Sequence, residues 1–460
     1  MSTPRIDPVI LREYDIRGIV GDNLDADVAR ALGSAFGDRV REAGGSVVAV
    51  GRDGRTSSPA IAGGMIEGLR EAGMDVLDVG QGPTPMLYFA TYEPGADAGV
   101  MITGSHNPPD YNGLKMMLKG APFFAGDIQK LGEAARSYSR RSVSGKVTET
   151  PIFDDYIAKL ASAYRPGRAL KVVWDAGNGV AGPSVEALVN RIEGEHVCLF
   201  TEVDGTFPNH HPDPTVEKNL VDMVAAVKRH GADIGIAFDG DGDRIGVVDA
   251  QGRVLWGDQL MCVLAADVLA SRPGSTIIAD VKTSQVFFDE VARLGGEALM
   301  GRTGHSLIKK MMKETGAPLA GEMSGHIFFA DEYHGFDDAL YAAVRLLRIL
   351  AASGQSLADM RDALPQLVNT PEMRFPCPED RKFAAVAEVL ARVAAAGEGE
   401  LNDIDGVRLK TDDGWWLLRA SNTQDVLVAR CESATEEGLQ RLRDALVAQL
   451  AASGIQLPDA

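Results

Sequence analysis

Short apolar runs alternate with amphipathic helical patterns over the first three quarters of the chain. Each unit begins with an apolar strand, passes through a polar loop into a helical pattern, and ends in a second apolar strand. This order predicts the crossover units of parallel α/β sheets, and it occurs three times. The predicted strand, helix and strand are residues 46–50, 61–72 and 74–79, then 171–174, 184–189 and 196–200, then 275–280, 284–294 and 297–300.

The C-terminal segment breaks this order. It predicts a strand, a helix, three consecutive strands and a last helix near 435–450, for which Ser433 and Glu436 predict a capping box. The fold class is therefore α/β, with three related mixed α/β sandwich domains followed by a smaller α+β C-terminal domain. The predicted domains are residues 1–150, 151–251, 252–366 and 367–460, and the last contains strands at 372–375, 406–411, 415–420 and 426–431 and a helix at 380–395.

Composition narrows the class of protein. The chain has 460 residues, 45% of them hydrophobic and 24% charged, which suffices for several cores. With 65 acidic and 46 basic residues the net charge is -19, which argues against nucleic-acid binding and requires local positive pockets for any anionic substrate. The four cysteines have no metal or redox spacing, and no apolar stretch is long enough for a signal peptide or a membrane span. We expect a cytoplasmic protein with no nucleic-acid or membrane partner, and a monomer is compatible with the sequence.

The sequence TGSHNP at 103–108 places a serine and a histidine in a loop after an apolar run. Gly104 permits a positive φ and the following Asn-Pro-Pro prevents a helix, so we expect Ser105 and His106 to be exposed at a strand end. A plain turn uses the same residue types. An activated or phosphorylated serine is the chemical alternative, and Lys115 and three polar loops downstream favour it.

The sequence DGDGDR lies between the apolar runs 234–238 and 245–248. Alternate residues of an extended segment project to one side, so Asp239, Asp241 and Asp243 are predicted to converge. Converging carboxylates repel one another unless a cation lies between them, and a hard ion completed by a phosphate oxygen is typical of Mg²⁺. A calcium EF-hand would need glycine and glutamate at positions that hold Arg244 and Ala250, and the apolar flanks disfavour a solvated acidic hairpin.

Two further loops offer polar groups. In GEMSGH, alternation predicts Glu322, Ser324 and His326 on one side, where a carboxylate and a hydroxyl can hold the hydroxyls of a sugar. In RASNT, the fork of Arg419 and the donors of the following turn suit a phosphate that does not react. A capped turn and a hairpin turn are the alternatives. Three polar residues that follow strands of the third unit, Lys282, Arg302 and His305, are weaker candidates.

A glycine-rich loop raises a rival function. Gly177, Gly179 and Gly182 follow a strand and precede a helix, and Glu202 and Asp204 come about 20 residues later, as in dinucleotide-binding domains. The same glycines can serve close packing of strand against helix. We favour packing, because an NAD-binding oxidoreductase would leave the other four motifs without a role.

The stretch TGSHNPPDYNGLK resembles the active-site loop of the α-D-phosphohexomutases, most closely their bacterial phosphomannomutase/phosphoglucomutase branch. The resemblance covers essentially the whole chain, through YDIRG, DGDGDR, GEMSGH and RASNT in that order. It implies reversible phosphoryl transfer between C1 and C6 of mannose and glucose phosphates, by way of a phosphoserine and a hexose 1,6-bisphosphate. Ser105 would carry the phosphate, and that phosphate would join the three aspartates around one Mg²⁺ per chain.

The resemblance also implies roles for the other motif residues. Glu322 and Ser324 would hold O3 and O4 of the sugar, and Arg244 would face the substrate. Lys115 and His326 are the candidates for proton transfer, and the fourth domain would act as a phosphate-binding lid. The implied catalytic set is Ser105, His106, Lys115, Arg17, Arg244 and His326, and the implied substrate-binding set is Tyr14, Arg17, Lys282, His305, Glu322, Ser324, His326, Arg419, Ser421, Asn422 and Thr423.

Two alternatives remain within this family. Phosphoglucosamine mutases usually have glutamine where this chain has Met323, so the resemblance favours mannose and glucose phosphates over glucosamine phosphates. A catalytically inactive sugar-phosphate sensor would be expected to have lost Ser105 or one of the aspartates, and the chain retains all of them.

Overall fold

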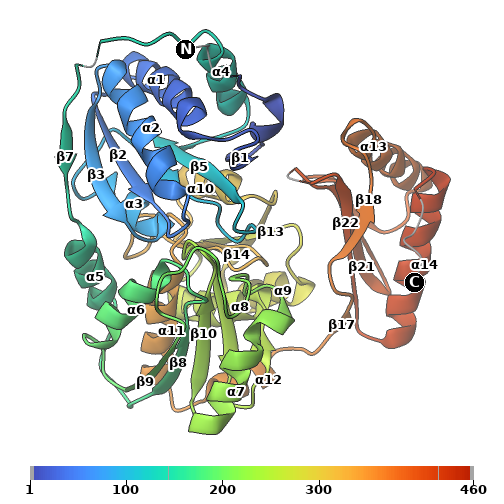
Figure 1. The fold of residues 1–460 in the computed structure, drawn as a ribbon. Coiled ribbons are helices and arrows are strands. Elements are labelled where there is room, and N and C mark those ends of the chain that lie inside the picture. The colour runs from blue at the N-terminus through green and yellow to red at the C-terminus, as the bar shows by residue number, and fades with distance from the viewer. Residues whose placement is uncertain (1–4, 143, 423, 456–460) are drawn as a thin grey trace.

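The computed structural model describes residues 5–142, 144–422 and 424–455, and arranges them in four β-sheets with their helices (Figure 1). The first sheet has the order β1-β5-β4-β2-β3-β7, with β6 beside β5. Its β2 runs parallel to β3 and β4, whereas β5 is antiparallel to β1 and β4, so the sheet is mixed. The elements of this domain are η1 (Pro8–Ile10), β1 (Ile16–Ile19), α1 (Ala26–Glu42), β2 (Val47–Arg52), α2 (Ser58–Glu71), β3 (Asp75–Gln81), α3 (Thr84–Ala90), β4 (Ala98–Ile102), β5 (Tyr111–Leu118), β6 (Ala121–Phe123), α4 (Gly126–Ala135) and β7 (Val147–Glu149).

The second sheet has the order β12-β11-β10-β8-β9. Its short β12 pairs with β11, a few residues beyond the predicted boundary at 251. The elements of this domain are α5 (Phe153–Ser162), β8 (Lys171–Asp175), α6 (Ala181–Val189), β9 (Glu195–Leu199), η2 (Glu217–Leu220), α7 (Val221–His230), β10 (Ile234–Phe238), β11 (Ile245–Asp249) and β12 (Val254–Leu255).

The third sheet has the order β14-β13-β15-β16. Parallel pairing of β2 with β3, of β8 with β9 and of β13 with β14 confirms the three predicted crossover units. The elements of this domain are α8 (Gly257–Ser271), β13 (Thr276–Asp280), α9 (Gln285–Arg293), β14 (Glu297–Gly301), α10 (His305–Thr315), β15 (Leu319–Gly321), β16 (Ile327–Phe329), α11 (Ala339–Ala352) and α12 (Leu357–Asp362).

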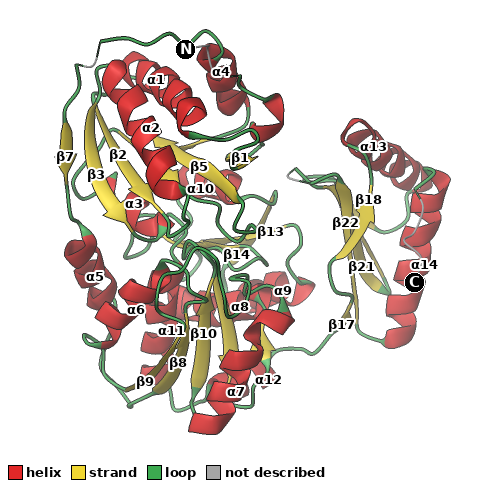
Figure 2. Cartoon of the chain, viewed as in Figure 1, coloured by secondary structure: helices red, strands yellow, loops and turns green. Residues whose placement is uncertain are grey.

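The fourth domain is antiparallel, with the order β17-β22-β21-β20-β19 and β18 beside β22, and both of its helices lie on one side of the sheet (Figure 2). The predicted fold class is confirmed. The predicted capping box is wrong, because Thr435 caps α14 by accepting from the Gly438 amide, while Ser433 still belongs to β22. The elements are β17 (Val368–Asn369), β18 (Met373–Pro376), α13 (Glu379–Ala396), β19 (Glu400–Asn402), β20 (Val407–Thr411), β21 (Gly414–Ala420), β22 (Val426–Ser433) and α14 (Glu436–Ala452).

The polar motifs lie in the loops that end four buried strands. TGSHNP follows β4 and DGDGDR follows β10, whereas GEMSGH begins at the last residue of β15 and RASNT at the last two residues of β21. Every residue of β4, β10 and β15 is buried, so these strands anchor their loops in the cores of the first three domains. Among the described residues, no helix has the length and apolar character needed to cross a membrane.

Candidate active site

Hydrogen bonds from Arg55, a residue that the sequence analysis did not identify, stabilise the serine loop after β4. Arg55 donates from one terminal nitrogen to the carbonyls of Ser105 (2.8 Å) and Asn107 (2.6 Å), and from the other to those of Pro108 and Tyr111. Asp53 accepts from Arg55 Nε at 3.2 Å and from the Gly104 amide at 3.0 Å. Ser105 has φ 51°, a left-handed conformation that these contacts maintain.

Ser105 is only 2% exposed, so the expectation of an exposed serine is wrong. The DGDGDR loop of the second domain covers it, and a Cβ on Gly240 would stand 2.4 Å from the Ser105 carbonyl. The Ser105 hydroxyl lies 3.0 Å from Asp239 Oδ2 and 3.1 Å from His106 Nδ1. Burial and nearby cations hold the pKa of His106 well below its ordinary value, which keeps that imidazole neutral.

The three aspartates converge and are completely buried. They do so through a tight turn with Gly242 at φ 73°, and not through the extended alternation that we predicted. Burial and the two neighbouring carboxylates raise the pKa of Asp239 well above its ordinary value. Asp241 Oδ1 and Asp243 Oδ1 accept no hydrogen bond from any described residue, and ligand atoms of all three side chains lie within 4.8 Å of one another. This donor set fits a hard divalent cation.

Lys115 on β5 neutralises part of this charge. Its Nζ lies 2.8 Å from Asp241 Oδ2 and also contacts Asp243 Oδ2. Burial lowers the pKa of the Lys115 ammonium, but the carboxylates outweigh burial and raise that pKa well above its ordinary value. Burial alone would raise the pKa of Asp241, yet Lys115 and a hydrogen bond from Thr84 lower it. Lys115 therefore stays charged at neutral pH.

His326 connects the aspartate loop to a carboxylate that the sequence analysis missed. Arg244 Nε donates to His326 Nε2 at 2.9 Å, and His326 Nδ1 lies 3.0 Å from Asp337 Oδ2. Since Nε2 accepts, the ring proton belongs on Nδ1, facing Asp337. Burial raises the pKa of Asp337, but Lys309, 2.8 Å away, and the neighbouring His326 lower it well below its ordinary value.

His305 and Arg17 border this cluster. His305 stacks on His326 with ring centroids 5.3 Å apart, and burial with nearby Lys309 lowers the pKa of His305. Arg17 on β1 donates to Asn107 of the serine loop at 3.1 Å and pairs with Asp15 at 2.5 Å.

The GEMSGH loop is also a tight turn, so the predicted alternation is absent. The Glu322 amide donates to the His326 carbonyl, and Gly325 has φ 90°. Burial raises the pKa of Glu322, whose Oε1 accepts from the Gly304 amide at 2.6 Å. Ser324 remains half-buried. The turn thus places Glu322 and His326 directly opposite each other, joined by this backbone hydrogen bond.

The RASNT loop reaches the first and third domains. Asn422 donates to the Tyr14 hydroxyl at 2.5 Å, and that hydroxyl donates to the Thr303 carbonyl at 2.6 Å. Burial raises the pKa of Tyr14 to about 12. Arg419 is buried, and its Nε donates to Asp405 Oδ2 at 2.9 Å. Tyr14 therefore joins three domains at one point.

The remaining predicted residues have the following places. Ser421 caps its own turn by accepting from the Gln424 amide at 3.1 Å, and Lys282 Nζ lies 3.3 Å from Glu372 Oε2. Thr423 lies outside the described residues. Arg302 is exposed.

The glycine-rich loop serves packing. A Cβ on Gly182 would stand 2.0 Å from the Thr201 carbonyl, and one on Gly179 would stand 2.8 Å from the Gly240 carbonyl. Gly177 has φ 52°, and a Cβ there would stand 3.2 Å from His210. These close approaches explain the glycines as contacts with neighbouring chain, including the aspartate loop, and the dinucleotide is not needed to explain them.

Comparison with known proteins agrees with this arrangement. Family profiles for phosphoglucomutase/phosphomannomutase match residues 8–142 (alpha/beta/alpha domain I), 154–252 (domain II), 256–368 (domain III) and 372–449 (C-terminal domain). A phosphomannomutase/phosphoglucomutase of Pseudomonas aeruginosa is 45% identical over 461 residues, which cover 100% of this chain and 99% of that protein. A phosphoglucomutase of Neisseria meningitidis is 44% identical over 95% of each chain.

The fold comparison agrees as well. The crystal structure of a phosphoglucomutase/phosphomannomutase family protein from Burkholderia thailandensis, 44% identical, matches 99% of this chain and 100% of that chain with a TM-score of 0.93. Both comparisons extend over all four domains. The chain therefore belongs to the phosphoglucomutase/phosphomannomutase family.

Proposed function

We propose that this protein is an isomerase that moves a phosphoryl group reversibly between C1 and C6 of hexose phosphates, with Ser105 as the phosphoryl carrier. The observation that carries the proposal is the convergence of the Ser105 hydroxyl, the three buried aspartates and the cations of Lys115 and Arg244. The names of relatives at 44 to 45% identity over nearly the full chain support the same activity. In the proposed cycle Ser105 gives its phosphate to the free hydroxyl of a hexose phosphate, and the bisphosphate returns its other phosphate to Ser105 after turning end for end.

The site must offset a large repulsion. A phosphoserine facing a sugar phosphate at about 5 Å sets two near-dianions together, which costs on the order of 10 kcal/mol at an effective dielectric of about 20. Lys115, Arg244 and Arg17 supply positive charge at the reacting end, and Arg419 supplies it on the fourth domain. Phosphoryl transfer depends on positioning and charge stabilisation, so this cationic set is what the reaction requires.

We assign a Mg²⁺ ion, one per chain, to Asp239, Asp241 and Asp243. The unpaired oxygens of Asp241 and Asp243 support this assignment. When bound, such an ion stabilises the negative charge of a transferring phosphoryl group.

The two candidates for proton transfer differ in their contacts. Lys115 Nζ contacts Asp241 Oδ2 and Asp243 Oδ2, so we assign it the role of a cation and not that of a base. His326 accepts from Arg244 at Nε2, and a turn of Arg244 towards the substrate phosphate would free that nitrogen. We therefore assign proton transfer to His326, with Asp337 holding the ring.

We propose mannose and glucose phosphates as substrates, with glucosamine phosphates used less well. Mannose and glucose differ only at C2, and a loop that holds O3 and O4 through Glu322 and Ser324 does not contact that carbon. A position that a site ignores usually changes kcat/KM much less than one whose hydroxyl the site binds. Exclusion of glucosamine rests on Met323 in place of glutamine.

A coupled assay tests class and specificity together. The expected result is turnover of mannose 1-phosphate and glucose 1-phosphate with kcat/KM values within about a hundredfold of each other, and slower turnover of glucosamine 1-phosphate. Phosphate label on the resting enzyme should survive acid and should be lost in Ser105→Ala. Label lost in acid would make His106 the carrier, and preference for glucosamine phosphate would overturn the substrate assignment. Sugar-phosphate binding without turnover would identify an inactive sensor.

A further inference from the structure

The face of the fourth sheet that its helices leave free packs against the third domain. Along β21, Trp416 and Leu418 enter the core beneath α13 and α14. Trp415 and Leu417 alternate with them and pack on Val281, which follows β13 of the third domain. Arg419 of the RASNT loop has the same parity as Trp415 and Leu417, so this face carries both the candidate anion site and the interdomain contact.

Two buried arginines flank Leu417 on that face. Arg408 of β20 and Arg430 of β22 are both direct cross-strand partners of Leu417, so the three side chains lie in one row. Arg408 donates to the carbonyls of Val281 (2.5 Å) and Thr283 (2.8 Å). Arg430 donates to the carbonyl of Lys282 at 2.6 Å. Three consecutive carbonyls of the lysine-bearing loop thus accept from the fourth domain.

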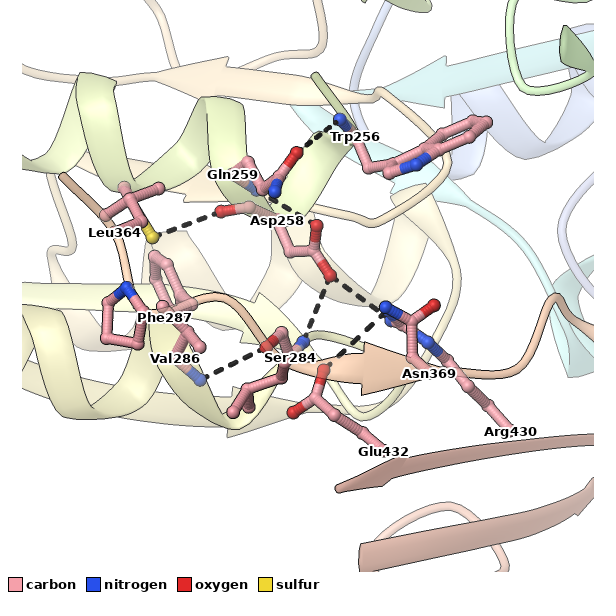
Figure 3. A pocket seen from close by; sticks show the side chains of 13 residues that line it. Trp256, Asp258, Gln259, Ser284, Val286, Phe287, Leu364, Asn369, Arg430 and Glu432 are labelled. Carbon is pink, nitrogen blue, oxygen red and sulfur yellow. Dashed lines mark hydrogen bonds and ion pairs between the residues drawn. The ribbon is translucent and has the colours of Figure 1, made fainter. Parts of the chain in front are cut away.

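Residues of β22 on the same face also bind side-chain and backbone groups of the third domain. Arg430 also donates to Asp258 Oδ2 at 3.2 Å, an oxygen that accepts from the Ser284 amide (Figure 3). Glu432 Oε1 accepts from Trp415 Nε1 and, across the interface, from the Gln285 amide at 2.9 Å. In Figure 3 Arg430 extends from its strand towards Asp258, with Glu432 and Ser284 beside it.

Arg430 makes one more contact, with the sugar-loop candidate. One of its terminal nitrogens lies 2.6 Å from the sulfur of Met323, the residue between Glu322 and Ser324. A single guanidinium therefore touches both the Lys282 loop and the GEMSGH turn. Arg408 and Arg430 are 3% and 6% exposed, so solvent does not replace these contacts while the fourth domain is seated.

We propose that Arg408 and Arg430 are positioning residues, which couple seating of the fourth domain to placement of Lys282 and of the turn around Met323. The inference rests on the proposed function, in which these two loops bind the hexose phosphate. Both arginines are buried between the two domains and make these contacts through Nη1, so the proposal assigns neither of them a contact with substrate. The fourth domain then acts twice, directly through Arg419 and indirectly by fixing the loop of Lys282 in the third domain.

Hydrogen–deuterium exchange tests whether the two arginines hold the Lys282 loop, and the result does not depend on the enzymatic activity. The variants are Arg408→Lys and Arg430→Lys, which keep the positive charge but replace the planar guanidinium and its several donors by a single ammonium. Arg392→Lys is the control, because Arg392 donates within the fourth domain to Gln449 and Ser453. We expect the amides of residues 281–286 to exchange faster than in the wild type in the first two variants. In the control they should exchange at the wild-type rate. Wild-type exchange in both test variants, folded as judged by thermal melting, would overturn the proposal.

A double-mutant cycle tests whether the device acts through Lys282. Arg408→Lys is expected to raise KM for glucose 1-phosphate about tenfold in the wild-type background and less than twofold in Lys282→Ala, because interacting sites are not additive. A merely structural role predicts a full multiplicative loss, which would refute the coupling. If Arg408→Lys does not fold, Arg430→Lys serves in the same cycle with the same refuting result.

The two proposals fail differently. A wild-type protein without turnover would refute the proposed mutase. The double-mutant cycle is then carried out on Kd for glucose 1-phosphate, measured by calorimetry. The exchange experiment needs no activity, so the coupling between the two domains can be tested in either case.

Discussion

Replacing Arg55 with methionine is expected to abolish most activity by releasing the serine loop. Arg55 is 2% exposed and serves four carbonyls of residues 105–111 while paired with Asp53. The methionine fills much of the same volume and donates nothing. The Asp53 carboxylate then keeps its hydrogen bonds from Ser58 and Gly104 but loses its counter-ion.

The magnitude follows from these contacts. Removing one partner of a buried ion pair costs about 3–5 kcal/mol. For a domain of roughly 150 residues that corresponds to a fall of roughly 10 °C in the melting temperature of the first domain. Ser105 would leave its left-handed conformation, and a shift of about 1 Å at a reacting group lowers kcat by about a hundredfold.

Melting and steady-state kinetics on Arg55→Met and Arg55→Lys separate the two effects. Arg52→Met is the matched control, since Arg52 ends β2, is only half-buried and reaches Asp78 only at 3.6 Å. The control should keep wild-type kcat. If Arg55→Met melted early but turned over normally at a temperature where it is folded, the serine loop would not depend on Arg55 and the reasoning would be wrong.

Three further changes have defined outcomes. Asp241→Asn should weaken activation in a Mg²⁺ titration far more than it lowers the melting temperature, and an unchanged metal requirement would place the ion elsewhere. Gly240→Ala sets a Cβ 2.4 Å from the Ser105 carbonyl and should lower kcat at least about tenfold. The control is Gly354→Ala, where the added Cβ meets open space and kcat should not change. Equal kcat values for the two variants would contradict the prediction. Burial raises the pKa of Asp338 to about 7, so the folded state holds this proton to higher pH than the unfolded state and wild-type stability falls as pH rises towards 7. We therefore compare the free energy of urea unfolding of Asp338→Asn with that of the wild type. The variant's value minus the wild-type value should be up to about 3 kcal/mol larger at pH 8 than at pH 5, and a difference that does not change with pH would refute the assignment.

The periodicity of the sequence predicted the fold because each crossover unit has its own local pattern. Residues such as Val48 and Val50 face one core and Ala49 faces another, so β2 reads as a continuous apolar run. Sheet order and the capping residue of α14 depend on tertiary contacts. Thr435 caps that helix because β22 continues to Ser433, and no local signal marks where the strand ends.

The motif loops could be singled out from the sequence because each lies beside an apolar run and they occur together in one order, although their residue types are ordinary for turns. Their supports could not. Arg55 stood in an ordinary turn sequence, GRDGR, and Asp337 stood in a pair of aspartates before a helix. Only the fold brings Arg55 within 2.8 Å of the Ser105 carbonyl and Asp337 within 3.0 Å of His326. The converging aspartates were predicted for the wrong reason, because a turn does what extended alternation was expected to do.

The buried charges also explain why metal and phosphate belong together in the proposed cycle. Asp239, Asp241, Asp243 and Asp337 are completely buried, and the cations in direct contact with them are Lys115 and Lys309. Burial and then the neighbouring carboxylates of Asp241 and Asp243 raise the pKa of Asp239, and Arg244 and Lys115 offset this only in part. A phosphate on Ser105, 3.0 Å from Asp239, would add nearly two negative charges to this cluster. A divalent cation on the aspartates would offset both, so each of the two ligands would strengthen binding of the other, and a phosphate on the serine would be stable beside carboxylates that otherwise repel it.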